Sequence, residues 1–301
     1  MKDNKFYSYM IMIIGILAVS TAAIFVKLAT EVPPAMIANY RLLFATITLL
    51  PFLLIFKRRE LVQLTKKDWL LIALAGISLC IYFILWFQSL HYTSVASSAI
   101  FIALQPILAF LATSLLFKER FSQGATISII ISIAGCFIIA WGDLKQSSTL
   151  FYGDILALLA TFFITVYFLL GQKVRKHVSL LTYTTTAYLF GTIGAVLFNI
   201  VLRNDFFSYS TKEWGVFVSI AIVPTVIGLN LLNLALKRMR TSLFSTGIIF
   251  EPVAASLLAF IILHENISWW QWLGGMILIF GLLLFIASTR RKRKMKVTIT
   301  P

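Results

Sequence analysis

The sequence predicts an all-α integral membrane protein, in which ten transmembrane helices form two inverted five-helix repeats around a central cavity. Three observations predict this class: the composition, a series of ten apolar runs, and a match of the sequence to itself at a fixed offset. The 301-residue chain is 60% hydrophobic and 12% charged. Soluble proteins carry about 45–50% apolar and about 25% charged residues, so this composition suits a lipid bilayer.

The ten apolar runs are each about as long as a membrane-spanning helix, which needs about 20 mostly apolar residues. Charged residues, turn residues or Trp separate them. The expected spans are 8–28, 34–56, 69–90, 95–117, 124–142, 151–171, 179–201, 214–236, 242–263 and 269–288. We interpret the first run as a retained span because no small-residue cleavage site follows it. An even number of spans places both chain ends on one side.

Lys and Arg are distributed unevenly between the two sides of these spans. Of the 26 Lys and Arg residues, only Lys145, Arg203 and Lys212 fall in loops opposite the termini, while Lys27 and Arg41 lie within spans. The positive-inside rule therefore predicts cytoplasmic N- and C-termini. The net charge of +15 is then explained by membrane anchoring, so we expect a lipid bilayer and no nucleic acid as partner.

The second half of the chain repeats the first at an offset of 146 residues. Gln105-Pro106 aligns with Glu251-Pro252, and "LFATI" from Leu43 aligns with "LFGTI" in the second half. Each repeat contains five spans, so the second repeat enters the membrane from the opposite side. Inverted repeats with a site between them at the midplane are typical of secondary transporters.

This repeat divides the chain into three parts. We expect a first five-helix repeat at 8–142, a second and inverted repeat at 151–288, and a basic cytoplasmic tail at 289–301.

Glu251 and its repeat equivalent Gln105 lie near the middle of their spans. Glu251 is about nine residues, or roughly 14 Å, from the cytoplasmic end. An ionisable residue at that depth costs about 2.5–3.5 kcal/mol and indicates a functional site. Pro106 and Pro252 each remove a backbone donor, so we expect a helix break at both. Glu251 is either a protonatable or substrate-facing carboxylate, or a hydrogen-bonding group that holds neighbouring helices together.

Arg41 is the other deeply embedded charge, near 10 Å from the outer end of the second span. It could extend to the outer surface, bind an anionic substrate group or pair with Glu251, whereas Lys27 is expected to extend to the surface. Further candidates are polar or aromatic side chains within spans, which as a set suggest a cavity for an amphipathic solute. They are Ser20, Thr21, Tyr82, Trp86, Gln88, Tyr167, Asn230 and Asn233. Each alone is also compatible with a helix–helix hydrogen bond or a lipid-facing aromatic.

The sequence argues against an enzyme. It contains no HExxH, GxSxG or P-loop pattern, and its two cysteines and three histidines show no metal-binding spacing, so we expect no metal and no cofactor. An intramembrane enzyme would need paired catalytic residues at one depth, and the spans offer one acid, one Arg and no deep His. A lipid-handling scaffold would not need polar breaks at the midplane.

Two segments resemble the drug/metabolite transporter (DMT) superfamily, specifically its ten-span EamA-type transporters. They are "LHYTSVASSAIFIALQPILAFLATSLLFKERF" from Leu90 and "TSLFSTGIIFEPVAASLLAFIILHENISWWQWLGGMILIFG" from Thr241. In each, a Pro precedes a Glu by 13 residues and a Gly-rich span follows, and "RLLFA" from Arg41 also fits. The resemblance extends over about residues 9 to 288.

The resemblance implies a monomeric basket of ten helices that opens alternately to the two sides of a bacterial cytoplasmic (plasma) membrane. It implies export of amino acids or related small metabolites, driven by protons or by the membrane potential because no nucleotide-binding motif is present. A drug or organic-cation exporter of the same fold is the alternative. Glu119 and Glu265, which follow the fourth and ninth spans, are expected to be partners of helix ends. The solute, the direction of transport and the coupling ion stay open.

Overall fold

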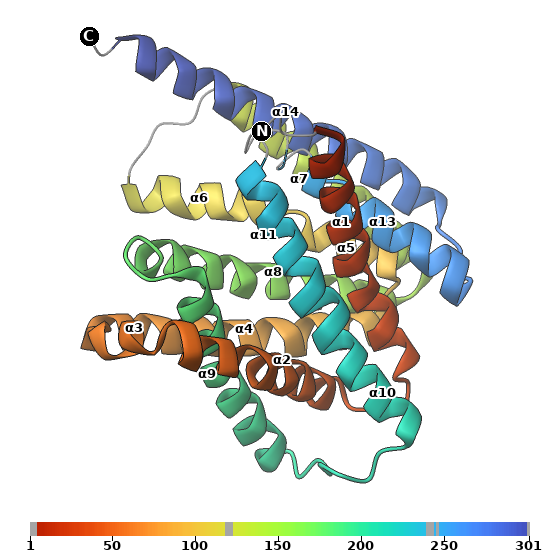
Figure 1. Cartoon of the computed structure of the whole chain (residues 1–301). Helices are drawn as coiled ribbons and strands as arrows, with labels where there is room; N and C mark the ends of the chain where they lie inside the picture. The colour runs from red at the N-terminus through yellow and green to blue at the C-terminus, as the bar shows by residue number, and fades with distance from the viewer. Residues whose placement is uncertain (1–4, 118–122, 239–243, 245–246, 300–301) are drawn as a thin grey trace.

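The computed structural model describes residues 5–117, 123–238, 244 and 247–299 of the chain (Figure 1). Every regular element among these residues is a helix, which confirms the all-α class. The elements are α1 (Lys5–Leu28), α2 (Pro34–Phe56), α3 (Arg58–Gln63), α4 (Lys66–Tyr92), α5 (Val95–Ile102), α6 (Gln105–Phe117), α7 (Gln123–Gln146), α8 (Ser148–Val174), α9 (Leu180–Val201), α10 (Thr211–Ile220), the π-helical η1 (Ala221–Gly228), α11 (Leu229–Arg238), α13 (Glu251–Leu258), the π-helical η2 (Ala259–Leu263) and α14 (Trp269–Ile299).

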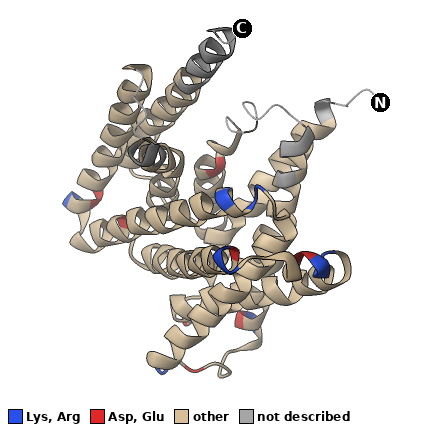
Figure 2. Ribbon diagram, turned by 90° about the vertical axis from the view of Figure 1, so that its left-hand side faces the viewer, with Lys and Arg blue, Asp and Glu red and all other residues tan. Residues whose placement is uncertain are grey.

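The ten-span arrangement is confirmed in this part of the chain. Nine helical segments are long and apolar enough to cross a membrane, and Glu251–Leu263 is a tenth, shorter apolar segment. The expected span 242–263 begins in residues outside the described ranges. Figure 2 shows long stretches of helix without charged residues, as a lipid environment requires. We call the face at which α2, α8 and α14 end the tail face, and the face at which α1, α4, α7 and α9 end the far face.

Several helices are longer than the apolar runs that predicted them, because polar residues cap their ends. Thr65 and Asp68 form a capping box at the start of α4, which satisfies backbone donors of the first turn. Ser147 caps α8 and is the single residue between α7 and α8. α14 continues to Ile299, through most of the expected tail 289–301, since residues 289–299 contain no Gly or Pro to end it.

The fourth and ninth spans are both interrupted at the predicted positions. α6 begins at Gln105 and α13 begins at Glu251, so Pro106 and Pro252 are each the second residue of the new helix. Proline is tolerated in the first turn of a helix, where its missing N–H has no intrahelical partner.

The two breaks have the same hydrogen bonds at equivalent positions. The Leu104 N–H donates to the Phe101 carbonyl at 3.1 Å, and the Phe250 N–H donates to the Gly247 carbonyl at 3.0 Å. Each bond links residues three apart, which tightens the turn before the next helix begins. The two donors are 146 residues apart, and so are the two acceptors. The repeat is therefore visible in the backbone hydrogen bonds as well as in the sequence.

Contacts between the halves pair equivalent residues, as expected for two inverted copies related by a two-fold axis. Thr46 on α2 and Thr192 on α9, which are 146 residues apart, share a hydrogen bond of 3.4 Å. At the crossing of α7 and α14, a Cβ atom added at Gly135 would lie 2.6 Å from the Gly274 carbonyl oxygen. A Cβ atom at the equivalent Gly281 would lie 2.8 Å from the Ser132 nitrogen. Small residues allow the helix backbones to approach closely at both points.

Glu60 on α3 connects the first half to the second at the tail face. Its carboxylate accepts hydrogen bonds from the Ser179 N–H and hydroxyl, both at 2.6 Å, and from the Thr182 hydroxyl at 2.5 Å. Partial burial acts to raise the pKa of Glu60, but these hydrogen bonds outweigh it and the pKa is lowered.

The lowered pKa of Glu60 predicts a pH-dependent contribution to stability. A group with a lowered folded-state pKa stabilises the fold above its unfolded pKa of about 4.3, and this contribution is lost as the pH falls through the folded pKa. We expect Glu60→Gln to reduce stability by about 1 kcal/mol at neutral pH, a value reduced for solvent screening. The deficit should disappear in strong acid. Thermal melting in detergent across pH measures this, with the exposed Glu31→Gln as control; a deficit independent of pH would contradict it.

Candidate functional site

Arg41 lies within the helix bundle rather than at the membrane surface. Its side chain is on α2 and only 5% of it is exposed. Its guanidinium carbon lies 4.3 Å from the centre of the Phe83 ring, and Trp86 and Phe87 are at 5.8 and 5.7 Å. These aromatic faces on α4 attract the cation. The expectation that Arg41 could extend to the outer surface is therefore wrong.

Thr225 on η1 holds the guanidinium in place. The Arg41 Nε donates to the Thr225 hydroxyl at 3.0 Å, and that hydroxyl donates to the Ile220 carbonyl at 3.1 Å. Ile220 is the last residue of α10, and its carbonyl is available because Pro224, four residues later in η1, has no N–H to donate to it. The sequence analysis did not single out Thr225, although a proline in the middle of the eighth span was a signal for it.

Two buried donors beside Arg41 have no hydrogen-bond partner among the described residues. They are the Arg41 Nη1 and the Trp86 Nε1. Tyr82 stacks on Trp86, with ring centres 5.5 Å apart, and forms one wall of this group. An unpaired buried donor costs about 1–3 kcal/mol, so such groups in a native fold require an explanation. Both nitrogens are hydrogen-bond donors that could serve an acceptor such as a carboxylate.

Glu251 provides a negative charge near this pair of donors. It is half-buried at the start of α13, and its charge is close enough to interact electrostatically with Arg41 and Tyr82. No ion pair joins Glu251 and Arg41 within the described ranges, because no nitrogen–oxygen distance falls within 4.0 Å. The Ser20 hydroxyl donates to the Glu251 backbone carbonyl at 3.3 Å and positions the break. Two opposite charges thus lie near each other without direct contact.

The other residues singled out from the sequence have varied surroundings, and only some of them lie near the group around Arg41. The Tyr167 carbonyl accepts a hydrogen bond from the Tyr183 hydroxyl at 2.9 Å, and Tyr188 is within electrostatic range of both Tyr167 and Arg41. Thr21 donates to the Ala18 carbonyl within α1, and Asn230 on α11 donates to the Val226 carbonyl of the preceding η1. Gln88 and Gln105 are half-buried, and the structure does not describe the side chain of Asn233. Position in the sequence therefore singled out Arg41, Trp86 and Glu251, but it did not indicate which other residues surround them.

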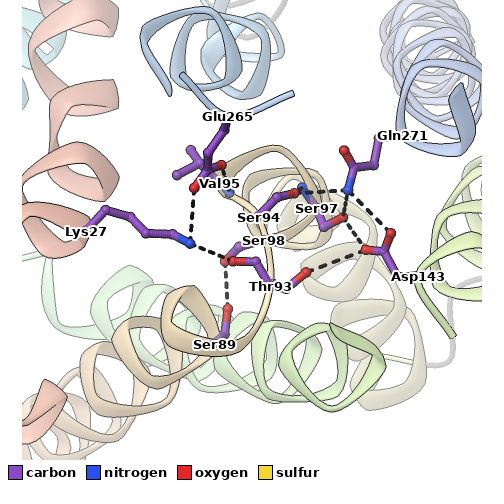
Figure 3. A network of polar contacts seen from close by, with 10 residues as sticks. All are labelled: Lys27, Ser89, Thr93, Ser94, Val95, Ser97, Ser98, Asp143, Glu265 and Gln271. Carbon is purple, nitrogen blue, oxygen red and sulfur yellow. Dashed lines mark hydrogen bonds and ion pairs between the residues drawn. The ribbon is translucent and has the colours of Figure 1, made fainter. Parts of the chain in front are cut away.

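A second polar cluster lies at the far face (Figure 3). The Lys27 amine is 3.1 Å from the Glu265 carboxylate and donates to the Thr93 carbonyl at 3.0 Å. Glu265 also accepts from the Val95 N–H at 2.9 Å, so it supports the start of α5, as expected of a helix-end partner. Lys27 does not simply extend to the surface, because the ion pair joins α1 to the connection between η2 and α14. Glu119, the repeat equivalent of Glu265, lies outside the described residues.

Two aspartates are buried in the same cluster. Asp143 on α7 is 0% exposed and Asp154 on α8 is 1% exposed. The Thr93 hydroxyl lies 3.0 Å from Asp154 and 3.5 Å from Asp143. The Ser97 hydroxyl donates to Asp143 at 2.6 Å, and the Gln271 amide donates to it at 3.3 Å. Figure 3 shows Asp143 together with Thr93, Ser97 and Gln271.

The sequence analysis did not single out either aspartate, since Asp143 follows the expected span 124–142 and Asp154 lies near the start of the expected span 151–171. A signal was present, because each follows a glycine: Gly142-Asp143 and Gly153-Asp154 flank the connection between α7 and α8. A Cβ atom at Gly153 would lie 2.8 Å from the Thr93 nitrogen, and one at Gly142 would overlap Trp270. The glycines thus allow the close approach that buries the neighbouring carboxyl groups.

Comparison with known proteins gives consistent results across the chain. The EamA-like transporter family matches residues 6–141 and again residues 151–287. A protein of Archaeoglobus fulgidus named an uncharacterized transporter is 27% identical over 88% of this chain and 92% of its own. The uncharacterized transporter YxxF of Bacillus subtilis is 27% identical over 78% of this chain and 74% of its own. A solved structure titled "Crystal structure of protein" has a TM-score of 0.65 at 18% identity, covering 94% of this chain and 98% of that one.

Proposed function

The chain belongs to the EamA-like transporter family, and from this premise we propose that it carries amino acids or related small zwitterionic metabolites by secondary active transport. The observation that carries the proposal is the group around Arg41. It combines two buried, unpaired N–H donors with a nearby acid on the other half of the chain. In the proposed complex, the substrate carboxylate accepts from Arg41 and Trp86, and the substrate ammonium lies at Glu251.

The chemistry of these side chains supports a substrate with both charges. A planar guanidinium suits a carboxylate, because its N–H groups match both oxygens. The aromatic rings of Phe83, Trp86 and Tyr82 exclude water around it, which strengthens the attraction between charges. An ordinary ligand site has this composition, with apolar walls and few convergent polar groups.

We propose that the tail face is cytoplasmic and that the protein works as a monomer in a bacterial plasma membrane. The concentration of Lys and Arg on the connections of that face supports the orientation. Alternating access would open a central cavity between residues 8–142 and 151–288 to one face at a time. A carboxylate that binds either a proton or the substrate ammonium would couple export to the proton gradient.

Replacing Glu251 by Gln is expected to uncouple transport from the proton gradient. Gln has nearly the same shape but cannot exchange a proton, so an imposed pH gradient should stimulate the wild type and leave the variant unchanged. Transport in proteoliposomes measures this, with a panel of amino acids and one organic cation, each with and without the gradient.

The same assay separates the alternatives. If the folded Glu251→Gln variant transports as well as the wild type under both conditions, Glu251 is structural and the coupling proposal is wrong. If only the organic cation is transported, and an Arg41→Met variant still transports it, the protein is a cation exporter and the amino-acid proposal is wrong.

A further inference from the structure

Two buried aspartates at the far face are not part of the proposed substrate site. Asp143 and Asp154 are both fully buried and lie on either side of one hydroxyl, that of Thr93. Removing one carboxylate from water is unfavourable, and two carboxylates that share a buried site repel each other. Some neutralising species must therefore accompany this pair.

The hydrogen bonds distinguish the two carboxyl groups. Asp143 accepts from Ser97 and from Gln271, which donate to different oxygens; this is the environment of an anion. Asp154 accepts from the Thr93 hydroxyl, and its Oδ2 is buried without a partner among the described residues. The Thr93 hydroxyl has one hydrogen and is nearer to Asp154. Asp154 is thus the poorly satisfied member and the place where a proton would reside.

The nearby cations do not neutralise the pair. The other titratable groups around it are Lys27, His91, Cys136, Lys145 and Glu265. The Lys27 amine contacts Glu265 and a backbone carbonyl, the Lys145 amine lies over the rings of Trp141 and Trp270, and His91 is exposed at the end of α4. Cys136 is a neutral thiol at most and adds no positive charge. No described Lys, Arg or His forms an ion pair with either aspartate.

We propose that Asp143 and Asp154 form a proton-binding site, and that the proton bound there holds the far face closed. Thr93 joins the two parts of this device, since its hydroxyl contacts the aspartates while its carbonyl accepts from Lys27. Loss of the proton leaves two adjacent anions, which repel each other and displace Thr93. The carbonyl contact to Lys27 is then lost, and with it one of the links from α4 to α1 and Glu265.

This inference rests on the proposed transport function, but the proton site is separate from the substrate site, so either proposal can fail without the other. Infrared spectroscopy of the full chain in proteoliposomes tests the proton directly. We expect the carbonyl stretch of a protonated, buried carboxylic acid to persist at neutral pH in the wild type and in Glu251→Gln. It should be lost in Asp154→Asn. A spectrum that is the same in the wild type, Asp143→Asn and Asp154→Asn would overturn the proposal, as would a band lost only in Glu251→Gln.

Hydrogen–deuterium exchange of residues 92–98 tests the closure. Comparison at equal pH removes the intrinsic pH dependence of exchange. Asn mimics the neutral acid, so Asp154→Asn should stay protected, whereas the wild type should exchange faster by up to tenfold for each pH unit above the titration. Lys27→Met should exchange fast at every pH.

Identical pH profiles for the wild type and Asp154→Asn would contradict closure by the proton. If Asp154→Asn does not fold, the wild-type infrared titration and Asp143→Asn still decide the question. Neither measurement uses a substrate, so a failed search for transported amino acids leaves this result unaffected.

Discussion

Arg41→Met is expected to weaken substrate binding strongly while the helix bundle stays folded. Met retains the length and apolar stem that pack against Phe83 and Phe87, but it removes the guanidinium. Truncating one partner of a buried, hydrogen-bonded charge pair costs about 2–5 kcal/mol, so affinity should fall by roughly 30-fold or more. Arg41→Lys keeps the charge but loses the planar fork, and we expect an intermediate loss.

Substrate binding to purified protein in detergent measures this effect, with tryptophan fluorescence, to which Trp86 contributes, as one readout. Thr225→Val is the matched comparison, because it removes the acceptor of the Arg41 Nε but keeps the positive charge, so it should lower affinity less than Arg41→Met does. Thermal melting of each variant separates lost binding from lost folding. Unchanged affinity in a folded Arg41→Met variant would make Arg41 a structural cation and would remove the main support for a carboxylate-bearing substrate.

Gly135→Ala and Gly281→Ala should each destabilise the protein, and by similar amounts. The new methyl group at Gly135 would lie 2.6 Å from the Gly274 carbonyl oxygen and 2.7 Å from the Leu278 nitrogen. At Gly281 it would lie 2.8 Å from the Ser132 nitrogen and 3.0 Å from the Ser128 oxygen. Backbone atoms cannot move aside without separating α7 from α14, so overpacking should reduce stability by about 1–3 kcal/mol in each case.

The control for this pair is Gly215→Ala on α10, where nothing lies within 4 Å of an added Cβ atom. That substitution should be neutral or slightly stabilising, since Ala favours helix more than Gly does. Thermal melting in detergent compares the three variants. A large difference between Gly135→Ala and Gly281→Ala would show that the two halves of the crossing do not contribute equally, despite their equivalent geometry.

The features that the sequence predicted correctly are local ones. Span positions follow from apolar length, and the breaks at Pro106 and Pro252 follow from a missing backbone donor. Counting residues also placed Arg41 inside a span, but it left open whether the side chain extends to the surface or stays within the bundle. Its partner Thr225 could not be predicted in the same way, because it lies 184 residues away and depends on how two helices pack.

The far-face cluster was missed for a related reason. Asp143 and Asp154 each sit near the end of an apolar run, where a charged residue normally meets water. Only the folded chain brings Thr93, Ser97 and Gln271 around them. Hydropathy measures depth along a helix, whereas burial also depends on which neighbour covers the helix end.

The single residue between α7 and α8 has a mechanical consequence. Two peptide units span at most roughly 7 Å, so Gln146 and Ser148 cannot move apart however the two halves rearrange. α7 belongs to the first repeat and α8 to the second, and Ser147 joins them without slack. The far-face ends of α7 and α8 therefore stay together when one half rocks against the other, and the far face can open only where other helices of the two halves meet.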